Sequence, residues 1–127
     1  MLKISKPTAT GIHIKFDKGG AESLLRHLFS AASEDLSFQA DSSLMQAFGG
    51  IRPGSLVILG DSPENNSLVL QGMALVIHTD PESIEYLSAK LNEFIQTGDF
   101  FPAEWIDLRV VNQEDEQTLY FIGTSET

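Results

Sequence analysis

The chain has 127 residues, 42% of them hydrophobic, with no cysteine and a formal net charge of −10. This composition predicts one folded domain over residues 1–127, because the apolar content is ordinary for a globular protein and too high for disorder. The absence of cysteine excludes disulfides, thiolate metal sites and a cysteine nucleophile. Neither a leader pattern nor an apolar run of roughly 18 residues is found, so we expect a cytoplasmic protein without membrane contact.

The charge is concentrated in the second half of the chain. Residues 1–63 contain six basic and six acidic side chains, whereas residues 64–127 contain two basic and twelve acidic ones and so carry the whole net charge. An acidic half repels nucleic-acid phosphate and attracts a basic partner. We therefore expect no nucleic-acid binding. The alternative to a recognition role is that the charge keeps the protein soluble.

The first half predicts the order strand, helix, strand, strand. Ile12, Ile14 and Phe16 alternate with polar residues, which is typical of a strand with one buried face. An amphipathic helix of roughly 12–14 residues is predicted from the helical spacing of Ala21, Leu24, Leu25, Leu28, Phe29 and Ala32. Residues 36–40 alternate again, 42–54 are expected to form a loop with at most a helical turn, and 55–60 form a buried strand.

The second half predicts the same order after a turn at 61–66. Residues 67–78 form either one bent strand or two, with Gly72 as a bulge in the first case. Asp80 is the expected N-cap of a helix and Pro81 its first residue. Apolar residues up to Ile95 supply the buried stripe of this helix. Strands are expected at 106–110 and 118–123, separated by a polar turn at 112–116.

The two halves also resemble each other in sequence. When the chain is shifted by 63 residues, 11–62 lies on 74–125 without a gap and ten positions are identical. That is about three times the agreement expected from ordinary amino-acid usage. We therefore predict an α+β fold in which two tandem β-α-β-β repeats form one mainly antiparallel sheet, with two helices packed on one face.

No residue pattern indicates catalysis, a metal or a cofactor. His13, His27 and His78 lack metal-ligand spacing and are interpreted as surface or rim residues. Gly19 and Gly20 lack the rest of a phosphate-binding fingerprint and are interpreted as a permissive turn. Carboxylate pairs fall where solvated acids are expected, and no serine lies in a nucleophile elbow. We therefore expect a protein that is not an enzyme.

A partner surface is predicted near the second helix's end and the strand that follows. Phe100, Phe101 and Trp105 either fill the core at this corner or provide a contact anchor. Alternation from 105 to 111 places Asp107 opposite the apolar side chains of its strand. The expected partner-binding residues, an aromatic centre with an acidic rim, are Asp99, Glu104, Trp105, Asp107, Glu114, Asp115 and Glu116.

Each half is similar to small immunity proteins of bacterial polymorphic-toxin systems, in having a strand, an Asp-led helix with Leu-Leu-x-x-Leu or a related pattern, and two strands. The residues concerned are 12–29 with 55–60, and 75–94 with 119–123. One such family has a His-rich strand after the helix, where this chain has Leu-Ser-Phe-Gln-Ala at 36–40. The resemblance implies a non-enzymatic inhibitor that binds a basic toxin, with no site residue carried over.

Two other functions stay open at this point. One is a structural or assembly module, such as a homodimer formed along an exposed strand edge. The other is a small enzyme or ligand-binding domain with a cleft between the repeats.

Overall fold

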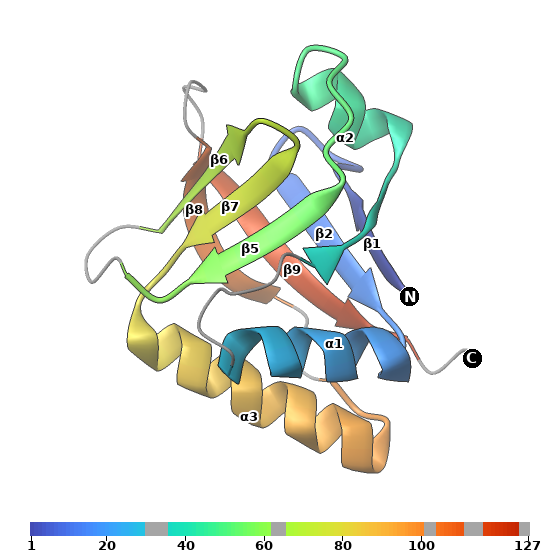
Figure 1. Cartoon of the computed structure of the whole chain (residues 1–127), viewed down its shortest axis with the longest axis vertical. Coiled ribbons are helices and arrows are strands. Elements are labelled where there is room, and N and C mark those ends of the chain that lie inside the picture. Colours follow the sequence, from blue (N-terminus) through green and yellow to red (C-terminus); the bar gives the residue numbers. More distant parts are fainter. Residues whose placement is uncertain (30–35, 62–65, 101–103, 111–115, 125–127) are drawn as a thin grey trace.

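The protein is α+β, as expected, and its strands form a single mixed sheet (Figure 1). The computed structural model describes residues 1–29, 36–61, 66–100, 104–110 and 116–124, and side chains are not described at 104–106. The elements in chain order are β1 (Leu2–Ser5), β2 (Gly11–Phe16), α1 (Lys18–Phe29), β3 (Leu36–Ser37), β4 (Gln39–Ala40), α2 (Ser42–Ala47), β5 (Ser55–Leu59), β6 (Ser67–Gln71), β7 (Ala74–His78), α3 (Pro81–Thr97), β8 (Glu104–Val110) and β9 (Glu116–Gly123).

The expectation of a mainly antiparallel sheet is wrong. The strand order is β3-β5-β7-β6-β8-β9-β2-β1-β4, and four of its eight pairings are parallel. The physical reason is that β5 pairs in parallel with β7, and β9 pairs in parallel with β2. The last strand of each half therefore bonds to a strand of the other half, a choice of partner that local alternation does not encode.

The sheet curls until its two ends meet. Its end strands β3 and β4 are separated in sequence by one residue, Phe38, yet β3 pairs with β5 and β4 pairs with β1. The Phe38 N–H donates to the Gly54 carbonyl oxygen at 3.2 Å and ties the bend to the start of β5. In Figure 1, β5, β7 and β6 accordingly lie in front of β9, β2 and β1.

Residues 67–78 form two strands, one of the two alternatives expected, joined by a turn in which Gly72 has a φ of 62°. Two other segments differ from the expectation. Residues 2–5 form β1, which was not predicted. Residues 42–47 form helix α2 in place of a loop, because the Asp41 carboxylate accepts the Ser43 N–H at 2.6 Å and caps it. At the 63-residue offset α2 falls on β8, so the two halves are not the same run of elements.

One hydrophobic cluster joins the strands to the helices. Alternate residues of β2 point inward, and α1 and α3, which lie side by side and run in opposite directions in Figure 1, add their apolar stripes to the same cluster. Phe16 meets Phe94 and Phe100 edge to face, with centroids 5.4 and 5.2 Å apart. Such aromatic pairs contribute about 0.5–1.5 kcal/mol each beyond burial. Phe100 is therefore a core residue.

Within the described residues, no helix is both long enough and apolar enough to cross a membrane.

Gly123→Ala should destabilise the protein by about 1–3 kcal/mol, since close packing leaves no room for a methyl group there. A Cβ at this position would lie 2.7 Å from Phe94 Cε1 and 3.0 Å from Phe100 Cβ. Gly54→Ala is the matched control, because nothing lies within 4 Å of its added carbon. Urea unfolding of both variants tests this, and equal stabilities would contradict the packing argument.

Candidate functional site

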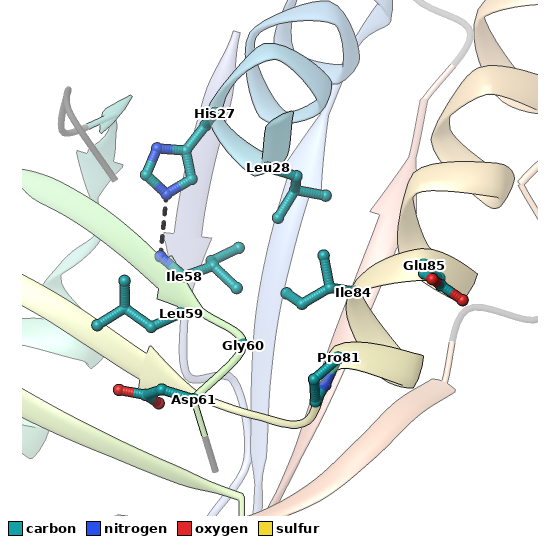
Figure 2. Close-up of a pocket in the computed structure, with 9 residues that line it drawn as sticks. All are labelled: His27, Leu28, Ile58, Leu59, Gly60, Asp61, Pro81, Ile84 and Glu85. Carbon is teal, nitrogen blue, oxygen red and sulfur yellow. Dashed lines mark hydrogen bonds between the residues drawn. The ribbon is translucent and has the colours of Figure 1, made fainter. Parts of the chain in front are cut away.

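A groove of about 440 Å³ lies where the end of α1, the end of β5 and the start of α3 meet (Figure 2). Apolar side chains form most of its walls, and two carboxylates and one imidazole supply the polar groups. The lining residues are His27, Leu28, Ile58, Leu59, Gly60, Asp61, Pro81, Ile84 and Glu85. It is called the α1–α3 groove below.

The start of α3 fixes one wall of the α1–α3 groove. Asp80 caps the helix by accepting the Ser83 N–H at 2.7 Å, and Pro81 follows at the first helical position. This N–H holds the pKa of the Asp80 carboxyl below its ordinary value. Gly60 lets β5 pass close to this wall, because a Cβ there would lie 3.0 Å from Ile84 Cγ1. Capping and close approach together set the width of the groove.

His27 is buried and structural, so its interpretation as a surface or rim residue was wrong. It is 4% exposed, and its Nε2 accepts the backbone N–H of Ile58 at 3.0 Å (Figure 2). An accepting Nε2 carries no proton, and it is not available to bind a metal or to act as a base. The bond ties α1 to β5. It also satisfies a main-chain donor at the wall of the groove.

The other two histidines lie elsewhere. His78 Nδ1 is 2.8 Å from the Asp61 carboxylate, next to the groove but on β7. His13 packs edge to face against Tyr120 with centroids 5.1 Å apart, and partial burial together with Lys15 lowers the pKa of His13. Among the described residues, no group of three or more His, Cys, Asp or Glu is arranged to hold a metal ion.

The chemistry of the groove favours binding an apolar group that carries a positive charge. None of its lining residues is a serine, threonine, cysteine or lysine. Leu28, Ile84 and Pro81 offer apolar surface, while the carboxylates of Asp61, which is 2.8 Å from His78 Nδ1, and Glu85 lie at opposite edges of the groove (Figure 2). Pockets of this size and polarity take a small apolar body and orient it with a few polar contacts.

The sequence-predicted partner residues are distributed over two regions. Asp107 and Glu116 are exposed on β8 and β9; Asp107 accepts the Thr118 hydroxyl at 2.8 Å, and Glu116 lies opposite Arg109. Asp99 is exposed after Gly98, which ends α3. Glu104 and Trp105 lie in β8 with side chains that are not described, and Glu114 and Asp115 lie outside the described residues.

Sequence reasoning missed a second set of carboxylates, on the outward side of α3. Glu82, Glu85 and Glu93 are exposed there, and Tyr86 among them is 50% exposed. They alternate at helical spacing with the buried Leu87, Leu91 and Phe94, so the same periodicity that predicted the core could have found them. Glu85 also lines the α1–α3 groove, which makes the acidic surface and the groove continuous.

Comparison of the chain with protein-family models, with curated proteins and with solved structures gave no significant match.

His27→Leu should lower the free energy of unfolding by about 1–3 kcal/mol, because it leaves the Ile58 N–H without an acceptor. His13→Leu is the control, since His13 is partly exposed and accepts no such buried main-chain bond among the contacts described. Urea unfolding and amide exchange at Ile58 measure the effect. Unchanged protection at Ile58 in His27→Leu would contradict the proposed tie.

Asp80→Asn should make stability less dependent on acid pH while keeping the helix capped, because asparagine is also a good N-cap. The pKa of Asp80 is lowered in the folded protein, so its contribution is complete above the ordinary aspartate pKa and is lost as pH falls through the folded value. The free energy of unfolding, measured with urea between about pH 6 and 2, should fall less steeply with decreasing pH in the variant than in the wild-type protein. An unchanged slope would show that the carboxylate has no part in capping.

Proposed function

We propose that this protein is a non-enzymatic binding module that recognises a basic protein through the outward side of α3 and the α1–α3 groove. The observation that carries the proposal is the continuity of the two surfaces at Glu85. Apolar side chains of a partner would enter the groove, and its cations would meet Glu82, Glu85 and Glu93. Complementary charge of this kind accelerates association and selects partners.

The charge on α3 is more uniform than on its neighbour α1. The exposed positions of α1 include Lys18, Glu22 and Arg26, so the two signs alternate there. On α3 the single lysine, Lys90, lies over the Phe100 ring at 5.7 Å, which draws its charge toward the core. The outward side of α3 is thus left with carboxylates around Tyr86, a residue type enriched in binding hot spots.

The toxin-neutralising role implied by the resemblance to immunity proteins is one form of this proposal. In that form the partner is a basic toxin, and the protein acts in the cytoplasm without binding nucleic acid or membrane. The strand-edge homodimer is less well supported, because the end strands β3 and β4 contain two residues each. A small ligand in the groove remains the second candidate, supported by the groove's volume of about 440 Å³.

We also propose that the fold arose by duplication within one domain. In support, β2 and β7, α1 and α3, and β5 and β9 correspond at the 63-residue offset. Under that correspondence the pairing of β5 with β7 is equivalent to the pairing of β9 with β2, and both pairings are parallel. The α1–α3 groove would then be the cleft between the two repeats.

Reversing charge on α3 should slow association with a basic partner by about tenfold or more, with a weaker dependence on salt. The test compares Glu82→Lys/Glu85→Lys with Asp107→Lys/Glu116→Lys, which alters net charge equally on β8 and β9. The partner assayed is the product of the adjacent gene, by surface plasmon resonance at about 50 and 300 mM NaCl.

Three outcomes separate the hypotheses. Slower association only in the α3 pair supports the proposal, and slower association only in the β8–β9 pair favours the surface predicted from sequence. Equal rates in both pairs, with melting temperatures unchanged, would assign the acidic charge to solubility.

A further inference from the structure

A second groove, of about 630 Å³, lies between the paired strands β1 and β4 and the start of β5. It is formed where the chain leaves the sheet at Asp41, passes through α2, which is labelled in Figure 1, and returns at Arg52. Its lining residues are Lys3, Phe38, Gln39, Ala40, Asp41, Arg52, Pro53, Gly54 and Met73. It is called the α2 groove below.

The α2 groove follows from the way the sheet closes. Leu36 and Ser37 pair with β5, but Gln39 and Ala40 pair with β1, so the two sides diverge at Phe38. Main-chain bonds hold the far wall in place: the Gly54 and Ser55 N–H groups donate to the Met73 carbonyl oxygen at 2.8 and 3.3 Å. The opening is therefore built from backbone fixed on both sides.

Two cations from opposite sides of this opening line it. Lys3 belongs to β1 and Arg52 precedes β5, and both are exposed. Within the part of the chain that is described, neither forms an ion pair. The groove's one carboxylate, Asp41, accepts the N–H and hydroxyl of Ser43, and these bonds, together with the nearby charge of Lys3, hold the pKa of Asp41 below its ordinary value.

A third cation adds to the positive charge beside the groove. Lys15 on β2 lies directly opposite Lys3 on β1, and like charges in that position destabilise a sheet. Three of the eight basic residues thus gather near one opening in a protein of net charge −10. Exposed Met73 and partly buried Phe38 supply apolar surface in the same groove.

We propose that the α2 groove binds a small amphipathic anion, a carboxylate or sulfonate that carries an apolar body. Lys3 and Arg52 pair with the acid group, Arg52 through the fork of its guanidinium. Phe38 and Met73 pack against the apolar body. The volume of about 630 Å³ lies within the usual range for small-molecule sites. This site is separate from the acidic α3 surface and does not depend on its role.

The test uses two fluorescent probes that differ in charge. The anionic probe is 8-anilinonaphthalene-1-sulfonate, and the neutral one is N-phenyl-1-naphthylamine, which lacks the sulfonate. In the 127-residue protein, Lys3→Gln/Arg52→Gln should weaken sulfonate binding about tenfold and leave binding of the neutral probe unaffected. The control, Lys18→Gln/Arg26→Gln, removes the same charge from exposed positions of α1. Thermal melting monitors folding of each variant.

The proposal is tested by comparing the two double variants with each other and the two probes with each other. A loss of sulfonate affinity confined to the Lys3/Arg52 pair, together with loss of its salt dependence, supports the site. The proposal is overturned if both pairs of substitutions weaken the sulfonate equally, because net charge alone would explain that result. It is also overturned if neither does, or if the wild-type protein does not prefer the sulfonate to the neutral probe.

Discussion

The structure depends above all on the exchange of strands between the two halves of the chain. The main-chain hydrogen bonds of β5 to β7 and of β9 to β2 each join one half to the other. Because both pairings are parallel, the chain must cross over between the paired strands. The segment between β5 and β7 contains only β6, whereas the segment between β2 and β9 contains both α1 and α3. The two helices follow β2 and β7 and are thereby brought side by side. The α1–α3 groove exists because β5 ends beneath that junction.

The closure of the sheet at Phe38 has a comparable effect at the other end of the molecule. A single strand that bonded both neighbours along its whole length would leave no opening, as β7 does between β5 and β6. The first half instead divides this pairing between β3 and β4, and inserts α2 before β5. Both grooves therefore come from departures from regular pairing, one at a crossover and one at a bend, and neither requires a strained backbone.

The local sequence pattern was sufficient to predict most of the helices and strands, but it was insufficient to predict which strands pair. Alternation predicted β2, a compact apolar run predicted β5, and the Asp80–Pro81 start with its apolar stripe predicted α3, because these signals lie within one element. The parallel pairings depend on residues far apart in sequence and could not be read from alternation. β1 and α2 are short, and α2 buries only Leu44, so each carries little periodic signal beyond the Asp41 cap. The burial of His27 could have been predicted, because it lies three residues after Leu24 on the face of α1 that the core covers.

Net charge is a poor guide to what each surface of this protein attracts. At physiological ionic strength a charge is screened over about 8 Å, so a ligand near the sheet closure responds to Lys3 and Arg52 more than to carboxylates on α3. A chain with a net charge of −10 can therefore present one surface suited to cations and one groove suited to anions. The charge preference of each surface depends on the side chains that the strand pairings between the two halves, and the bend at Phe38, bring close together.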